Sequence, residues 1–324
     1  MVNCVPETVT LGICDVIFFK ALAMKKIRNL YEEYRSLPHW YYHLTFDSLE
    51  NGQLFYDDGD YAQGMNGIAI GQHLFDISII AFNLMINHCH ILASGTGENM
   101  VKLFSFMKRR LNNRLRTGRH PELEENYGFK LVRVEDERQL RDTIIYIARN
   151  PLKACPEIAS GGYPWGSTSL IFNKMTSLFS WIELKDMSKR EKEKYLKTQV
   201  QLPDDYHYNQ KMGFILPESY VLTWKAEQVL GNSWNYAYDI VRKIDAYVRI
   251  AEGVGEMVIL TDNELDEVIR QNVRKMFNAD SVRDLGTDDK CRLAVLLRNK
   301  YKVNVKRIAR KLQINMAALK KLFE

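Results

Sequence analysis

The stretch FDISIIAFNLMINHCHILAS, residues 75–94, decides the fold class of this chain. Its first half, residues 75–85, is apolar at most positions, which predicts a central strand, and its second half predicts a neighbouring strand. Side chains at positions i and i+2 of a strand project to the same face, so His88 and His90 lie side by side while Cys89 points to the other face. Two neutral imidazoles in that arrangement can converge on one divalent ion.

The predicted elements around this stretch alternate between strands and helices. In chain order they are a strand at 40–46, a helix at 57–74, the two central strands, an amphipathic helix at 98–117, a strand at 129–134 and a helix at 136–150. Pro151 is expected to end the last helix. The order β-α-β-β-α-β-α is typical of an α+β domain, with helices packed on a mostly antiparallel sheet.

The remainder of the chain is predicted to be helical. Residues 174–255 are charged and contain no recognisable chemical motif, which indicates a connector or accessory region. Near the C-terminus a helix at 288–300 is followed by two short helices, whose apolar sides carry Ile308, Leu312 and Leu319. This spacing is typical of a helix-turn-helix, whose second helix would enter a major groove of DNA.

The composition is that of a globular protein, with 46% hydrophobic residues and a formal net charge of +5. The five cysteines are scattered and form no C-x-x-C pair, so the sequence indicates neither a disulfide framework nor a zinc ribbon and favours a reducing compartment. The most apolar N-terminal stretch, LGICDVIFFKALAM, is interrupted by Asp15 and Lys20 and is too short to span a membrane. We therefore expect a cytoplasmic protein without a membrane segment.

Basic residues gather in two places. Residues 102–119 and 290–321 contain no acidic residue, and this predicts two contacts with a polyanion. The alternative, two solvated helix faces, stays open on charge alone. The candidate DNA-binding residues are Lys102, Lys108, Arg109, Arg110, Arg114 and Arg116 in the first cluster, and Lys306, Arg307, Arg310, Lys320 and Lys321 in the second.

A tyrosine on the helix at 136–150 is the candidate nucleophile. Asp142, Tyr146 and Asn150 follow one another at spacings of four and share one helix face. An ordinary amphipathic tyrosine is a common alternative. However, a phenol beside a metal-activated phosphate can attack phosphorus. Asn150 offers a neutral oxygen ligand that suits a hard cation.

The blocks YYHLTF, LFYDDGDY, IIAFNLMINHCHIL, KRRLNNRL, DTIIYIARNPLKA and GGYPWGS occur in this order within residues 39–172. Together they resemble the REP-associated tyrosine transposases, which belong to the single-tyrosine HUH transposases. Two departures are Cys89, where a bulkier aliphatic residue is usual, and Asp47, where the family often has an arginine.

The resemblance implies a ferredoxin-like HUH domain that binds Mg²⁺ or Mn²⁺ through His88, His90 and Asn150. Tyr146 would attack single-stranded DNA at hairpin or palindromic repeats, leaving a 5′-phosphotyrosine and a free 3′-OH that can later rejoin strands. It further implies a bacterial, nucleoid-associated protein that acts as a monomer or homodimer. Exposed aromatic residues such as Tyr41 or Tyr42 would stack on unpaired bases.

The expected organisation has four parts: an N-terminal helical segment (1–38), the HUH transposase domain (39–172), a helical accessory region (173–260) and a helix-turn-helix domain (261–324), which would anchor the protein to duplex DNA. Two other functions stay open. One is a non-catalytic DNA-binding regulator that acts through the C-terminal helices. The other is a metal-dependent hydrolase in which water, not Tyr146, is the nucleophile.

Overall fold

The computed structural model describes residues 28–47, 52–154, 162–173 and 180–323. Its larger sheet consists of β1 (Trp40–Phe46), β2 (Ser78–Met85), β3 (His88–Gly95) and β4 (Phe129–Arg133). The strand order is β2-β3-β1-β4, and every neighbouring pair is antiparallel. The α+β class and the antiparallel sheet predicted from the sequence are therefore confirmed.

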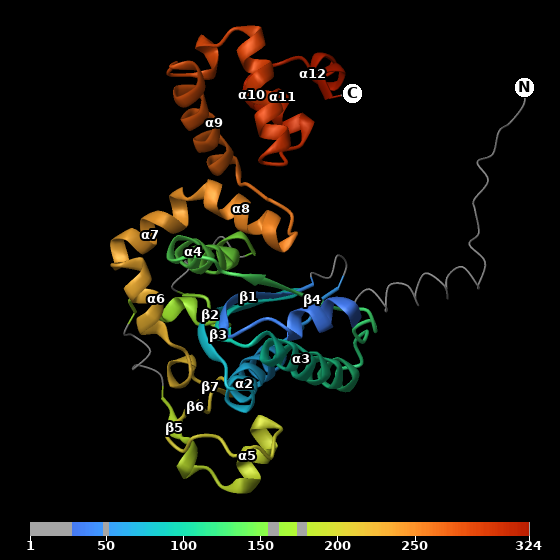
Figure 1. Ribbon diagram of the computed structural model, residues 1–324, viewed down its shortest axis with the longest axis vertical. Coiled ribbons are helices and arrows are strands. Elements are labelled where there is room, and N and C mark those ends of the chain that lie inside the picture. The colour runs from blue at the N-terminus through green and yellow to red at the C-terminus, as the bar shows by residue number, and fades with distance from the viewer. Residues whose placement is uncertain (1–27, 48–51, 155–161, 174–179, 324) are drawn as a thin grey trace, which may run out of the picture.

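Helices cover both faces of this sheet (Figure 1). One face packs against α2 (Asp58–Leu74) and α3 (Gly97–Thr117), and the other packs against α4 (Glu137–Ala154). The period of two along β3 separates the faces: Cys89 and Ile91 belong to the core beneath α2 and α3, whereas Leu92 belongs to the core beneath α4. His90 therefore lies on the α4 side of the sheet.

Helix α4 continues through Pro151 to Ala154, so the predicted helix end at Pro151 is wrong. Proline has no N–H to offer to the carbonyl four residues earlier, which belongs to Ile147. Here the side-chain amide of Asn83 on β2 donates to that carbonyl at 2.8 Å. The neighbouring strand thus satisfies the group that proline leaves without an intrahelical partner, and the helix persists.

The region after the sheet domain is only partly helical. It contains a second antiparallel sheet of β5 (Ile182–Glu183), β6 (His207–Asn209) and β7 (Phe214–Ile215), and the helix α5 (Lys189–Leu196). The prediction of a wholly helical accessory region is wrong here, because strands of two or three residues show no periodicity in the sequence. Asn66 of α2 holds this sheet: its amide donates to the Gly213 carbonyl and accepts from the Ile215 N–H, both at 2.9 Å.

Three further helices, α6 (Thr223–Leu230), α7 (Ser233–Arg242) and α8 (Ile244–Val254), pack against α4. Consequently α4 is buried on nearly all sides, and the polar side expected from its sequence is covered by protein. Arg141 and Asp142 show how this is achieved, because Arg141 bonds Asp239 of α7 and Asp142 bonds Arg249 of α8, each at 2.7 Å.

The C-terminal part consists of α9 (Asp262–Phe277), α10 (Thr287–Asn299), α11 (Val305–Leu312) and α12 (Met316–Phe323). Three helices therefore occur where the sequence predicts them. Gln313, with a φ of 56°, ends α11 in a left-handed conformation. Ile308, Leu312 and Leu319 are buried between these helices as expected. The DNA-binding role of this part stays a prediction.

Some expectations lie outside the described residues, namely most of the N-terminal helical segment and Cys4, Cys14 and Cys155. Among the helices that the structure describes, none combines the length and the apolar character needed to cross a bilayer.

Candidate metal and nucleophile centre

His88 and His90 come together on β3 as predicted, with ring centroids 4.8 Å apart. Each ring uses one nitrogen in a contact that orients it. Nδ1 of His88 is 2.7 Å from Oδ1 of Asn87, and Nδ1 of His90 is 3.3 Å from Nε2 of the buried His43 on β1. In both rings Nε2 is buried without a hydrogen-bond partner.

Such atoms are costly to bury unless a ligand satisfies them. Metal-binding histidines typically use the second ring nitrogen in an orienting hydrogen bond, as both rings do here. Burial lowers the pKa of His88, His90 and His43, the last to about 3, so the imidazoles are neutral near pH 7. A neutral imidazole is the form that ligates a cation, and the residues present therefore fit a divalent metal.

Tyr146 lies against these histidines. Its ring is 5.2 Å from that of His90 and 5.8 Å from that of His43, both measured between centroids. On its other side it stacks on Tyr247 of α8 at 5.3 Å. The side chain is 1% exposed, and burial raises the pKa of its hydroxyl well above the ordinary value, with a further contribution from Glu256.

Glu256 is a member of this centre that the sequence interpretation missed. It follows α8, in the region expected to be accessory. Its ligand oxygen and the histidine nitrogens of His88 and His90 all lie within 4.8 Å of one another. The Tyr146 hydroxyl donates to Oε2 of Glu256, and Oε1 accepts from the Thr45 hydroxyl at 3.1 Å. A lone glutamate beyond a helix end carries no sequence signal that marks it as a ligand.

Asn150 lies one turn beyond Tyr146 and is buried. Its amide nitrogen donates to the Tyr146 carbonyl at 3.0 Å, so the side chain folds back along α4. Its role as a metal ligand stays a prediction.

The two tyrosines that were expected to stack on bases differ in their exposure. Tyr42 is fully buried and donates to the Pro38 carbonyl at 2.6 Å, so it cannot stack on a base. Tyr41 is partly exposed. Asp47 accepts the Gly128 N–H at 3.1 Å and thereby joins β1 to the start of β4.

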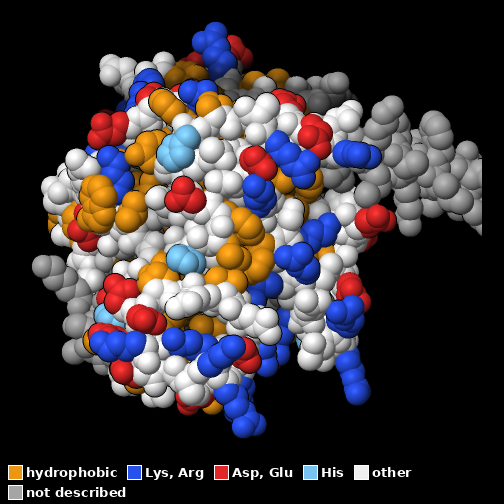
Figure 2. Space-filling view, turned by 60° about the horizontal axis from the view of Figure 1, so that its bottom comes forward, with side chains coloured by type: hydrophobic (Ala, Val, Ile, Leu, Met, Phe, Trp, Pro, Cys, Tyr) orange, Lys and Arg blue, Asp and Glu red, His pale blue; other side chains and the backbone are white. Residues whose placement is uncertain are grey.

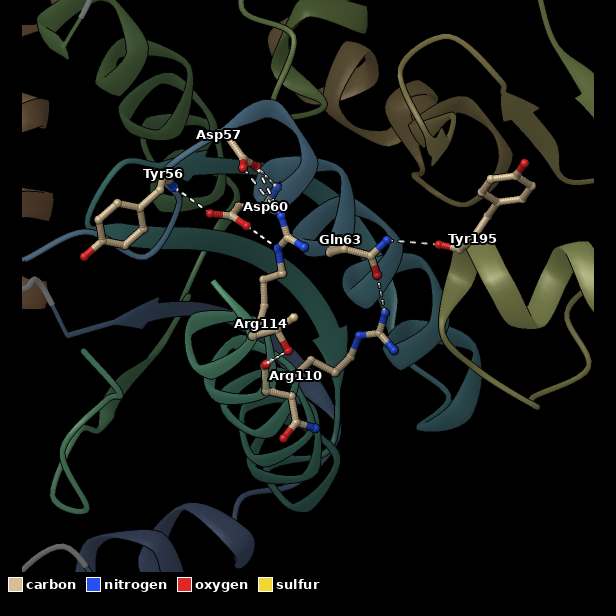
Figure 3. A network of polar contacts seen from close by, with 9 residues as sticks. Tyr56, Asp57, Asp60, Gln63, Arg110, Arg114 and Tyr195 are labelled. Carbon is tan, nitrogen blue, oxygen red and sulfur yellow. Dashed lines mark hydrogen bonds and ion pairs between the residues drawn. The ribbon is translucent and has the colours of Figure 1, made fainter. Parts of the chain in front are cut away.

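Helix α3, which carries the first basic cluster, lies on the face of the sheet opposite to α4, the helix that carries Tyr146 (Figure 1). Several of these basic residues bind other parts of the protein. Arg114 pairs with Asp60, and Arg110 donates to Gln63 of α2 at 3.2 Å (Figure 3). Arg110 also donates to the Leu196 carbonyl of α5 at 3.0 Å. These two arginines therefore fasten α2 and α5 to α3.

The other basic residues of α3 are available to a ligand to different degrees. Lys108 donates to the carbonyls of Glu125 and Tyr127, and Lys102 pairs with Glu98 at 2.9 Å. Arg109 is exposed. A groove of about 980 Å³ brings basic residues of α3 together with others near the start of the described chain: Arg28, Arg35, Lys108, Arg109 and Arg116, with Glu32, Glu122 and Glu125 among them. On the face shown in Figure 2, Lys and Arg side chains are most frequent in the right-hand and lower parts, with acidic side chains between them.

Some basic residues of the C-terminal helices also bind other parts of the protein, and others are exposed. Arg307 and Arg310 of α11 both pair with Asp262 of α9 at 2.7 Å, which attaches α11 to α9. Lys306, Lys320 and Lys321 are exposed.

Comparison with known proteins finds no sequence match and little structural similarity. No protein-family model and no curated protein sequence matches the chain. One solved structure, a REP-associated tyrosine transposase bound to a REP hairpin, overlaps 41% of this chain and 78% of its own, with 15% sequence identity and a TM-score of 0.34. At this TM-score the overlap does not define a shared fold.

Proposed function

We propose that this protein is a metal-dependent enzyme that nicks and rejoins single-stranded DNA, with Tyr146 as the nucleophile. In this proposal residues 39–172 form a ferredoxin-like HUH domain of the REP-associated tyrosine transposase type. The observation that carries the proposal is the meeting of three groups at the carboxylate of Glu256: the Nε2 atoms of His88 and His90, neither of which forms a hydrogen bond, and the hydroxyl of Tyr146.

The three groups supply the two requirements of phosphodiester transfer, which are a cation site and a nucleophile. His88 and His90 would hold Mg²⁺ or Mn²⁺, with Glu256 or Asn150 as a further oxygen ligand. A divalent ion polarises a scissile phosphate and offsets the charge that builds on its oxygens. The phenol oxygen of Tyr146 forms the new bond to phosphorus, the bond from phosphorus to the 3′ oxygen breaks, and the phenol proton ends on that 3′ oxygen. The 5′-phosphotyrosine retains the energy of the broken bond, so rejoining needs no nucleotide.

The approach of DNA is constrained by burial. Within the centre, His88 and Glu256 are partly exposed, whereas His90 and Tyr146 are covered. The scissile phosphate is therefore expected to enter from the side of His88 and Glu256. The basic groove along α3 lies on the other face of the sheet, so it would hold a more distant part of the hairpin, and the exposed lysines of α11 and α12 would hold duplex DNA.

The test is incubation of the full chain with an end-labelled hairpin oligonucleotide and Mn²⁺, followed by a denaturing gel. A covalent protein–DNA species is expected, and Tyr146→Phe should abolish it. Tyr236→Phe is the matched control, because Tyr236 is also buried and its hydroxyl bonds only at a distance from the centre, to the Thr168 carbonyl at 3.0 Å. An adduct that persists in Tyr146→Phe would exclude the assigned nucleophile.

The same gel separates the other functions. Metal-dependent cleavage without any adduct would favour attack by water. Specific DNA binding in a native mobility-shift assay, with no cleavage on the denaturing gel and no effect of Tyr146→Phe, would favour a regulator. The metal assignment is tested independently by Mn²⁺ binding, which His88→Ala and His90→Ala are expected to weaken strongly.

A further inference from the structure

Glu256 is placed by the end of α8. Gly255, with a φ of +70°, closes that helix in the left-handed region, which favours glycine. The chain then runs extended: Val258 and Leu260 are buried, while Met257 and Ile259 between them are 78% and 59% exposed. This alternation directs Glu256 inwards, towards the sheet.

The sheet holds this segment from two strands. Lys130 of β4 donates its ammonium to the Val254 carbonyl at 2.7 Å, the residue at which α8 ends. Thr45 of β1 donates to Glu256 at 3.1 Å. Gly255 also lies against Lys130 so closely that a Cβ atom there would collide with its ammonium. Together, β1, β4 and α8 therefore fix the position of the Glu256 carboxylate.

The two oxygens of this carboxylate face different partners. Oε2 accepts the hydrogen bond from the Tyr146 hydroxyl. Oε1 lies 3.5 Å from Nε2 of His90, one of the two unpartnered nitrogens. One carboxylate thus connects the atom that would attack phosphorus with the atoms that would bind the cation.

Resting on the proposed function, we propose that Glu256 is a catalytic residue contributed from outside the predicted HUH domain. Oε1 completes the cation site of His88 and His90, and Oε2 orients the Tyr146 hydroxyl and accepts its proton. When the phenol oxygen bonds to phosphorus, the proton passes to Oε2, and the departing 3′ oxygen takes up that proton. The accessory region is then part of the catalytic centre.

The experiment compares Glu256→Gln and Glu256→Ala with the wild-type full chain in two assays, Mn²⁺ binding by electron paramagnetic resonance and single-turnover formation of the DNA adduct. Both variants are expected to bind Mn²⁺ at least ~10-fold more weakly, because loss even of a group that only hydrogen-bonds to a metal ligand costs that much affinity. They should form the adduct at least ~100-fold more slowly, the usual effect of losing a general base. Glu252→Gln, an exposed glutamate of α8 that faces Lys302 at 3.8 Å, is the control and should match the wild type.

Opposite results overturn the inference. Wild-type Mn²⁺ binding by Glu256→Ala would remove the carboxylate from the cation site. Adduct formation that is unchanged or faster in that variant would show that Glu256 only blocks access to Tyr146 and is not a catalytic group. If the proposed function itself is wrong, the results differ from both of these outcomes. The wild type would then form no DNA adduct, and His88→Ala would bind Mn²⁺ as the wild type does. Thermal unfolding of each variant shows whether it is folded.

Discussion

The side-chain amide of Asn83 on β2 donates to the backbone carbonyl of Ile147 on α4, the carbonyl that Pro151 leaves without an intrahelical donor. Oδ1 of Asn83 in turn accepts from the Thr168 hydroxyl at 3.1 Å. One fully buried amide therefore holds both the helix that carries Tyr146 and the chain that follows it.

Replacing Asn83 by Leu is expected to lower the free energy of unfolding by about 2–3 kcal/mol, because it leaves the buried carbonyl and the Thr168 hydroxyl unpaired. Urea unfolding measures this. The loss should be smaller when Pro151 is replaced by Ala, since alanine restores the N–H that can reach the Ile147 carbonyl. Equal losses in the two backgrounds would show that the amide does not substitute for the missing helical bond.

Arg149 and Glu264 form a second buried connection, between α4 and α9. Arg149 is 2% exposed, pairs with Glu264 and donates to the Ile240 carbonyl at 2.9 Å. Glu264→Gln is expected to cost about 3 kcal/mol of unfolding free energy, because it leaves a buried guanidinium without its counter-charge. Glu98→Gln removes a pair with Lys102 that is exposed to solvent, so its effect on the unfolding free energy should be much smaller. Similar losses in both variants would contradict the buried pairing.

Stability should fall in acid below pH 6.5. Burial lowers the pKa of His43 from 6.5 to about 3, so between these values the unfolded chain binds a proton at this residue that the folded chain does not. The stability contributed by a neutral His43 is thus present above pH 6.5 and is lost as the pH falls towards 3.

The measurement is urea unfolding between pH 7 and 4, compared with His43→Gln. The slope of unfolding free energy against pH should be smaller in the variant by up to roughly 1.4 kcal/mol per pH unit, the value for one proton. Identical slopes would show that His43 is protonated in the folded protein.

Two arginines of α3 should differ in what they contribute: Arg114 to stability and Arg109 to DNA binding. Arg114→Ala leaves the carboxylate of Asp60, which is 5% exposed, without its ion pair and is expected to cost about 2 kcal/mol of unfolding free energy. Arg109→Ala should leave stability within about 0.5 kcal/mol of the wild type but weaken hairpin DNA binding. It should also reduce the salt dependence of binding by about 0.7 in the log–log slope. Fluorescence anisotropy at several salt concentrations measures both, and unchanged DNA affinity in Arg109→Ala would exclude this residue from the interface.

Much of the sheet domain could be predicted from the sequence because its signals are local. The aromatic and β-branched composition of β1, the apolar run of β2, the amphipathic character of α3 and the i, i+2 relation of His88 and His90 depend on neighbours in the chain. These features place the histidines together and place Tyr146 on an adjacent helix. The predicted end of α4 at Pro151 was wrong, because the side chain of Asn83 on β2 donates the hydrogen bond that proline cannot.

The rest of the centre depends on contacts between distant residues. Glu256 and Tyr146 are 110 positions apart, and no periodicity connects them. The same applies to His43, whose contact with His90 follows from the pairing of β1 with β3. Similarly, the charge run on α3 does not reveal that Arg110 and Arg114 are occupied by α2 and α5, because their acceptors lie in other elements.

The burial of Arg149 has a consequence for synthesis on the ribosome. This guanidinium belongs to α4, but its counter-ion Glu264 is translated more than a hundred residues later. Until α9 has emerged, α4 carries an unpaired charge on a surface that the finished protein buries. A chain released before α8 has been made would lack both this counter-ion and Tyr247, whose ring covers Tyr146 in the finished protein.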